Sequence, residues 1–163
     1  MAKKGWVVLL MVALAGTALP GCGEGGAESG AAVRVYVSAP LRGEAGAAGR
    51  RLCEEARQEA AKGRGDGELE LRVVCLDASG PEGPWTLARV GANARLASED
   101  SASIVYVGEP DRQARRQSRP IVEAAGIAEI GGVSGREAVA KAIAAIEEGD
   151  ESEPRQAVFD AVG

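Results

Sequence analysis

The sequence predicts a three-layer α/β fold of the Rossmann-like type, with a parallel sheet of about four strands and helices on both faces. Two observations predict it. Short β-branched runs alternate along the chain with longer stretches whose small apolar residues recur at helical spacing. Glycine and proline separate the two kinds of segment. The chain has 163 residues, enough for one domain of ordinary size.

Four apolar runs predict the strands. The first alternates in polarity, the second places four apolar side chains on one face, and the third has the composition of a buried strand. Gly108 ends the third run, and acids with a proline follow it as a turn and helix start. The predicted strands are residues 33–37, 68–76, 103–107 and 127–130.

Helical spacing predicts the helices. The first should bury Leu52, Cys53, Ala56 and Ala60. The second should bury Leu87, Gly91, Ala94 and either Ala97 or Ser98, with Gly91 allowing a close approach to the sheet. Pro120 should kink or split the third helix near Ser118, and Ser134 should cap the fourth. The predicted helices are residues 47–62, 85–98, 112–125, 135–148 and 154–162.

The first residues predict an export signal. Two lysines precede an apolar run over residues 6–19, which is the length of a signal-peptide core. The run ends in Leu19-Pro20-Gly21-Cys22, which resembles the bacterial lipoprotein box, whose cysteine is lipidated after cleavage. We therefore expect a lipoprotein signal peptide over residues 1–21 and a lipid on Cys22. The alternatives are a secreted protein with a chance cysteine and an uncleaved membrane anchor.

The residues after Cys22 predict how the domain is attached. Residues 22–30 are rich in glycine, serine and acids, which is typical of a flexible tether. The folded domain is expected over residues 31–163. A lipid anchor, a tether and a domain place the protein at the cell membrane, on its extracytoplasmic face.

Two internal cysteines are expected to form a disulfide. Cys53 lies early in the first predicted helix, and Cys75 lies in the last turn of the second strand. In a right-handed strand–helix–strand unit both positions fall at the same edge of the domain. An oxidising compartment favours the bridge, which would stabilise the fold by roughly 3 kcal/mol. The alternative is a pair of buried free thiols.

Composition excludes several classes of function. The formal charge is -5 and no basic face is evident, so a nucleic-acid partner is not expected. The chain has no histidine, and it shows no metal-ligand cluster, phosphate loop or serine elbow. Glu109 and Asp111 could form a catalytic carboxylate pair, but acids at a strand end more often cap a helix. We predict no enzyme activity, no metal and no cofactor.

A set of short motifs resembles a known family in its order and spacing. The chain resembles the first lobe of the type I periplasmic binding proteins, the branched-chain amino acid (Leu/Ile/Val) receptors of ABC importers. The similarity covers about residues 33–130, and residues 137–161 resemble the final helices of that family. The motifs are the lipoprotein box, Val35-Tyr36-Val37-Ser38-Ala39-Pro40-Leu41-Arg42-Gly43, Leu76-Asp77, Ala92-Asn93-Ala94-Arg95, Val105-Tyr106-Val107-Gly108, Pro120-Ile121 and Glu123-Ala124-Ala125-Gly126-Ile127.

The resemblance implies a ligand site at the carboxyl ends of the strands, where such sheets bind small ligands. Family members bind there with hydroxyls and backbone amides, whereas this chain has Glu109-Pro110-Asp111. Acids at this place suit an ammonium group and repel a carboxylate. The candidate ligand-binding residues are Ser38, Gly108, Glu109, Asp111 and Ser134.

Two functions follow from this resemblance. The first is a solute-binding lipoprotein of an ABC importer, reduced to one lobe, with an amino acid as solute and an ABC permease as partner. The alternative is an interaction or structural lipoprotein that keeps the receptor fold without its ligand. In that case the strand-end face would meet a partner or a second copy of the chain.

Overall fold

The computed structural model describes residues 32–63, 69–81, 84–150 and 152–163. The predicted signal peptide, lipid site and tether lie outside these residues. The strands are β1 (Ala32–Ala39), β2 (Glu70–Asp77), β3 (Ser103–Val107) and β4 (Ala128–Ile130). The helices are α1 (Gly46–Lys62), α2 (Leu87–Glu99), α3 (Arg112–Glu123), α4 (Gly135–Glu148) and α5 (Pro154–Val162).

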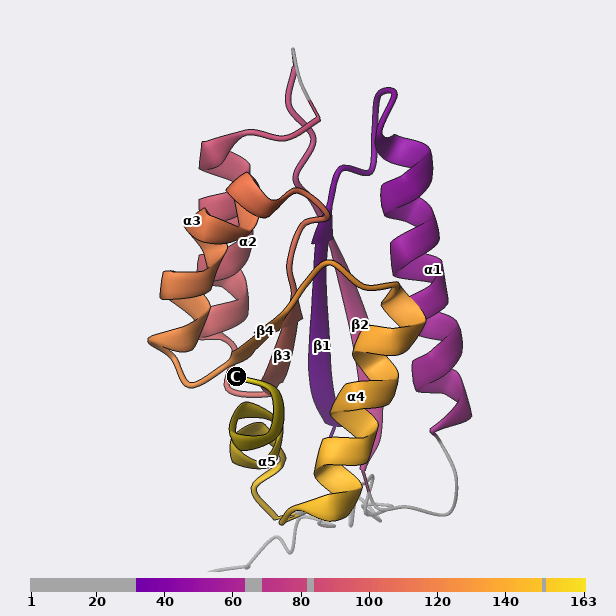
Figure 1. The fold of residues 1–163 in the computed structure, drawn as a ribbon, viewed down its shortest axis with the longest axis vertical. Helices are drawn as coiled ribbons and strands as arrows, with labels where there is room; N and C mark the ends of the chain where they lie inside the picture. Colours follow the sequence, from indigo (N-terminus) through magenta and orange to yellow (C-terminus); the bar gives the residue numbers. More distant parts are fainter. Residues whose placement is uncertain (1–31, 64–68, 82–83, 151) are drawn as a thin grey trace, which may run out of the picture.

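The four strands form one parallel sheet in the order β2-β1-β3-β4. Because the strands are parallel, their carboxyl ends meet at one edge, which lies at the top of Figure 1. We call this the carboxyl edge and the opposite one the amino edge. The predicted fold class is confirmed.

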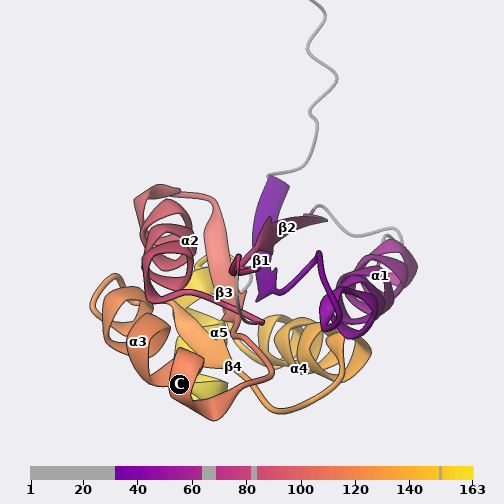
Figure 2. The same cartoon turned by 90° about the horizontal axis from the view of Figure 1, so that it is seen from above.

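Helices cover both faces of the sheet (Figures 1 and 2). On one face α1, α4 and α5 enclose an apolar core built from valine, isoleucine and alanine, as the scarcity of aromatic residues requires. On the other face α2 and α3 pack over a smaller core. That second core contains Tyr36, Ala94, Ala97, Tyr106, Val122 and Ile127.

Two glycines bring α1 and α4 close to their neighbours. A Cβ at Gly49 would overlap the carbonyl oxygen of Pro40, and one at Gly135 would overlap that of Leu52. Gly91 does not have this role, because the nearest atom to a Cβ there is Arg95 Nη1 at 3.6 Å. The close approach predicted for Gly91 is therefore wrong.

The buried stripe of α2 also differs from the prediction. Leu87, expected to face inward, is 60% exposed, and Val90 is fully buried in its place. Thr86 caps the helix, so Leu87 stands in its first turn. The sequence carries two overlapping stripes with helical spacing, and the structure buries the one with valine, which removes more apolar area from water than glycine would.

Pro120 does not split α3. The helix runs without a break from Arg112 to Glu123, and Pro120 stands in its last turn with its ring exposed. A proline cannot donate to the carbonyl four residues earlier, which is that of Arg116. Near the end of a helix and in contact with solvent, that loss is small enough for the helix to continue.

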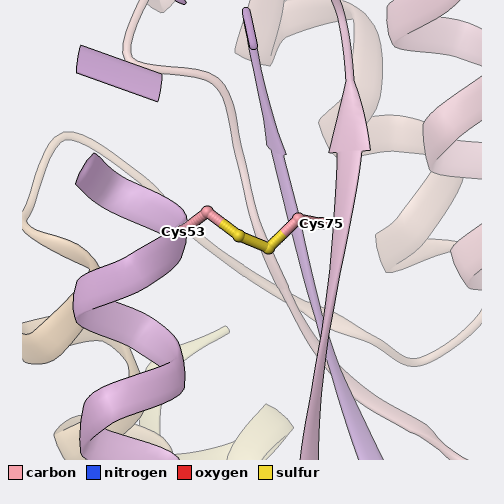
Figure 3. Close-up of a disulfide and its surroundings, with 2 residues drawn as sticks. All are labelled: Cys53 and Cys75. Atoms are coloured by element: carbon pink, nitrogen blue, oxygen red, sulfur yellow. A yellow bond between two sulfur atoms is a disulfide. The ribbon is translucent and has the colours of Figure 1, made fainter. Parts of the chain in front are cut away.

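Cys53 and Cys75 lie against each other between α1 and β2 (Figure 3), and the structure joins them in a disulfide. Their Cα atoms are 6.1 Å apart, within the usual range for bridged cysteines. Cys53 is buried in the large core, and Cys75 packs against it. That the two thiols are oxidised in the protein stays a prediction.

Candidate functional site at the carboxyl edge

The carboxyl edge is where the loops that follow all four strands meet. The pairing of β3 with β4 extends one residue past β3, since Gly108 donates its N–H to the carbonyl of Ile130 at 2.9 Å. A Cβ on Gly108 would lie 2.6 Å from Glu129 Oε1 and 3.0 Å from Arg115 Cγ. Glycine is therefore required at this position by the side chains that close over it.

A group of buried polar side chains lies just beneath this edge, on the α2–α3 side of the sheet. Tyr36, Tyr106 and Glu129 are register partners across β1, β3 and β4, so they form a row on that face. Strands β1, β3 and β4 and helices α2 and α3 each contribute one member to the group, and Glu109 comes from the loop after β3. We call the group the Glu109 cluster; it consists of Ser38, Asn93, Tyr106, Glu109, Ser118 and Glu129.

Glu109 is the centre of the cluster and is fully buried. Its Oε1 accepts hydrogen bonds from the hydroxyls of Ser38 at 2.5 Å and Tyr106 at 3.2 Å. Asn93 Nδ2 donates to Ser38 Oγ at 2.8 Å, which leaves the Ser38 proton for Glu109. Glu109 Oε2 lies 3.3 Å from Ser118 Oγ. The side chain is thus held by its own protein from several sides.

Glu129 is the second buried carboxyl group, with 4% of its surface exposed. Its Oε2 lies 3.0 Å from Ser118 Oγ, so this one hydroxyl stands between the two carboxyl groups. Glu129 Oε1 has no hydrogen-bond partner among the described residues. Such an unpaired buried oxygen is rare in folded proteins.

Burial dominates the titration of this cluster. It raises the pKa of Glu129 to about 7, against the hydrogen bond from Ser118 and the charge of Arg119. Burial also raises the pKa of Glu109, although the hydrogen bonds from Ser38, Tyr106 and Ser118 oppose it. The pKa of Tyr106 is raised by burial and by the neighbouring charge of Glu109.

A hollow lies elsewhere along the same edge, between the loops that follow β1 and β2. One part, of about 470 Å³, has Glu44 in its wall, and an adjoining part, of about 360 Å³, has Ser79 and Arg89. Arg42 lines both parts. Asp77 Oδ2 lies 2.6 Å from Arg42 Nε and 3.9 Å from Arg89 Nη1. Two guanidinium groups therefore share one carboxylate.

Hydrogen bonds fix the base of this hollow. Asp77 Oδ1 accepts from the backbone N–H groups of Leu41 and Ser79 at 3.0 and 2.9 Å. Burial alone would raise the pKa of Asp77, but the hydrogen bonds from Ser79, Leu41 and Arg42 outweigh it and lower the pKa. Asp77 thus keeps its charge and orients the two loops that form the hollow.

This fold is similar to that of a solved protein. The crystal structure of a possible leucine/isoleucine/valine-binding protein from Rhodopirellula baltica SH 1 matches with a TM-score of 0.51 and 18% identity. The match covers 63% of this chain and 27% of that protein. The domain has the fold of one lobe of a periplasmic binding protein. No family model and no curated protein sequence matches the chain.

At this level of identity the likeness concerns the fold alone, so the site of the lobe depends on its own residues. The structure brings three of the predicted ligand residues together, since Gly108 adjoins the Glu109 cluster that contains Ser38 and Glu109. Both side chains point into the protein and are buried. Their hydrogen-bonding groups are held beneath the edge instead of facing solvent.

The two remaining predicted residues cap helices. Asp111 accepts from the N–H groups of Gln113 and Ala114 at 2.7 and 2.9 Å, at the start of α3. Ser134 accepts from the N–H of Glu137 at 3.1 Å, at the start of α4. Both are exposed at the carboxyl edge, but neither lies in the Glu109 cluster.

Arg115 covers the edge above β3 and β4. Its Nη1 donates to the carbonyl oxygens of Glu109 and Pro110, each at 2.7 Å. Its side chain packs along Gly108 and Gly131, where added Cβ atoms would collide with it. Arg115 is therefore half-buried and bonded to the edge, whereas Arg112, Arg116 and Arg119 of the same helix are exposed. The available sequence signal for this contact was the pair Gly108 and Gly131, which follow two strands, with an arginine on the helix between those strands.

The hollow was also missed from the sequence. Arg42 belongs to a motif of the resemblance that gave it no role, and Ser79 and Arg89 lie in a loop and a first helical turn outside every motif. In the described part of the lobe, no group of three or more histidine, cysteine or acidic residues could hold a metal ion. None of the helices described there is long and apolar enough to cross a membrane.

Proposed function

We propose that the protein is an extracytoplasmic solute-binding lipoprotein of the branched-chain amino acid receptor type, anchored through Cys22 and working as a single lobe. The lipoprotein box and the fold support this proposal. The observation that carries it is the hollow at the carboxyl edge, the place where open α/β sheets bind small ligands.

The chemistry of the hollow suits a small zwitterion. Arg42 and Arg89 share the single carboxylate of Asp77, which leaves one positive charge for a ligand carboxylate. Glu44, in the wall of the larger part, can face an ammonium group. Gly108, Asp111 and Ser134 would frame the far side of the edge, and Ser38 and Glu109 would support it from beneath.

A single lobe should bind its solute weakly. Well-formed sites enclose about 70–90% of a ligand's surface, whereas one wall leaves much of it in water. Tight binding would then need a second protein surface closing over the ligand. An ABC permease or another binding subunit is the partner we propose for this.

The first test is a thermal-shift screen of the protein with amino acids and small organic cations. A ligand that binds only the folded state stabilises it by RT ln(1 + [L]/Kd), so Tm rises with the logarithm of the ligand concentration above Kd. We expect a shift with one class of amino acid, absent in Arg89→Gln and kept in Arg95→Gln. Both variants lose one arginine from α2, but only Arg89 lines the hollow.

The second candidate is an interaction lipoprotein that keeps the receptor fold without a solute. One observation favours it: Ser38 and Glu109, two of the polar side chains expected to contact ligand, are buried and bonded within the protein. In this case no solute shifts Tm, and the protein self-associates. A mass measurement in solution, run beside the screen, distinguishes the two candidates.

The anchor and the disulfide have their own tests. Cys22→Ala should move the protein from the membrane fraction to the soluble extracytoplasmic fraction, and full release of the unsubstituted chain would contradict the lipid anchor. Alkylation of the unfolded protein should label no thiol at Cys53 or Cys75 until a reductant is added. Labelling without reductant would mean two buried free thiols.

A further inference from the structure

The Glu109 cluster contains more acceptors than hydroxyl protons. Ser118 Oγ lies within hydrogen-bond distance of three oxygens: Glu109 Oε2 at 3.3 Å, Glu129 Oε2 at 3.0 Å and the carbonyl of Arg115 at 3.3 Å. A serine hydroxyl carries one proton and can donate to one of them. If both carboxyl groups were ionised, at least one carboxylate oxygen would face Ser118 Oγ with no proton between them.

A proton on Glu129 completes the network. Glu129 Oε2 then donates to Ser118 Oγ, and Ser118 donates to Glu109 Oε2. Glu109 keeps its charge with three donors, the hydroxyls of Ser38, Tyr106 and Ser118. A buried carboxylate with several donors is stable, whereas one whose second oxygen has no donor is costly. Glu129 Oε1, which has no partner, marks Glu129 as the group to be neutral.

The positive groups nearby do not replace this proton. Arg115 and Arg119, both on α3, are the cations that face Glu129, and no ion pair within 4.0 Å joins either to it or to Glu109 among the described residues. Arg115 bonds the carbonyls of Glu109 and Pro110, and Arg119 lies 3.6 Å from Glu123. From β3, Tyr106 is the titratable neighbour; α2 contributes the uncharged Asn93, and β1 contributes Ser38.

A bound cation does not fit the open side of Glu129 either. Its Oε1 packs against Gly108, where an added Cβ would lie 2.6 Å from that oxygen. In the described part of the chain, no three histidine, cysteine or acidic side chains come together to hold a metal ion either. A proton is the cation that this arrangement can hold.

We propose that Glu129 and Glu109 hold one shared proton through Ser118 at neutral pH, resident on Glu129, and that its loss is a pH-sensitive switch on the carboxyl edge. Without it, two negative charges face each other across one hydroxyl in a closed space. Glu109 leads directly into Pro110 and Asp111, so relief of that repulsion moves the edge. This inference stands apart from the proposed solute binding.

The direct test follows the carboxyl carbons of Glu109 and Glu129 by NMR in the full-length protein, with ¹³C-labelled glutamate, from about pH 4 to about pH 9. We expect the Glu129 signal, assigned by through-bond correlation to its own backbone amide, to titrate well above the ordinary glutamate range near about 4.3. Glu109 should stay ionised through the same step. If Glu129 titrates in the ordinary glutamate range, or if Glu109 carries the late proton, the proposal is overturned.

A second test uses unfolding by urea at about pH 5 and about pH 8. The side chain of Glu129→Gln keeps a donor toward Ser118 and cannot ionise, so its midpoint should stay constant where that of the unsubstituted protein falls. Glu147→Gln, in which an exposed acid of α4 is changed, should keep the original fall. An unchanged fall in Glu129→Gln would contradict the proposal; if that variant does not fold, the NMR titration decides.

Discussion

The two edges of the sheet each hold a carboxyl group against a tyrosine, yet they neutralise it in opposite ways. At the amino edge, Asp100 Oδ2 accepts from Arg34 Nη1 and Tyr36 OH, each at 2.7 Å. At the carboxyl edge, Glu109 Oε1 accepts from Tyr106 and Ser38, and no cation among the described residues binds the carboxylate. One edge uses an ion pair, and the other uses hydroxyls and, as we propose, a proton.

This difference gives the two edges opposite pH dependence. Burial would raise the pKa of Asp100, but hydrogen bonds from Arg34, Tyr36 and Ala102 outweigh it and lower the pKa. Its stabilisation is therefore present above its unfolded pKa, near 4, and is lost as the pH falls. The pKa of Glu129 is raised, so its contribution to stability is complete below its unfolded pKa and is lost as the pH rises to about 7.

Removing the central carboxylate of the carboxyl edge should have the largest effect. Glu109→Ala leaves the donors of Ser38, Tyr106 and Ser118 without their acceptor in a closed site. Each buried donor left without an acceptor costs about 1–3 kcal/mol. We therefore expect a loss of about 3 kcal/mol or more in the free energy of unfolding. Urea unfolding measures it, with Glu147→Ala as an exposed control; a loss below about 1 kcal/mol would mean the cluster is open to water.

The matching change at the amino edge should cost less. Asp100→Asn keeps the size of the side chain but turns an amide donor toward Arg34 and Tyr36, so we expect a loss of about 2 kcal/mol at neutral pH. The loss should shrink as the pH falls below about 4, where the carboxyl group of the unfolded chain takes up a proton, and vanish below the lowered pKa of Asp100 in the folded protein. Melting curves at several pH values test this, and a loss that does not vary with pH would contradict the ion pair's role.

A smaller effect is expected where α5 holds the amino edge. Arg155 donates to the carbonyl oxygens of Asp100, Ser101 and Ser103 at 2.7 to 3.0 Å. These carbonyls can regain water, so Arg155→Gln should cost only about 1 kcal/mol. Amide exchange in β3 should rise in this variant and stay constant in Arg136→Gln, which changes an arginine of α4. Equal amide exchange rates in the two variants would mean that α5 does not stabilise this edge.

The sequence predicted the α1 face of the sheet better than the α2–α3 face. Leu52, Cys53, Ala56 and Ala60 are all buried as expected, because their stripe is the only apolar one that α1 offers. On α2 two stripes overlap, and only packing against the sheet decides between them. Spacing along one element cannot supply that information.

The candidate site was predicted in place but not in detail. The carboxyl edge follows from the parallel sheet, and Glu109 was placed there by its position after β3. That its side chain turns inward depends on Ser38 and Ser118, which bond to it from β1 and α3, and on Asn93 of α2, which donates to Ser38. Contacts between residues so far apart in the chain leave no local pattern, and the same holds for Arg42 and Arg89 around Asp77.

The smallest predicted effects concern two glycines, Gly108 at the carboxyl edge and Gly91 away from it. Gly91→Ala fills open space on α2, where the nearest atom is a flexible arginine, and should raise stability by about 0.5–1 kcal/mol. Gly108→Ala has the opposite sign, because its Cβ meets Glu129 Oε1 and Arg115 Cγ within a closed cluster. Melting temperatures of the two variants test this. Stabilisation by both would mean that the Glu129 side chain can move away from Gly108, so that Gly108 does not hold it and its proton in place.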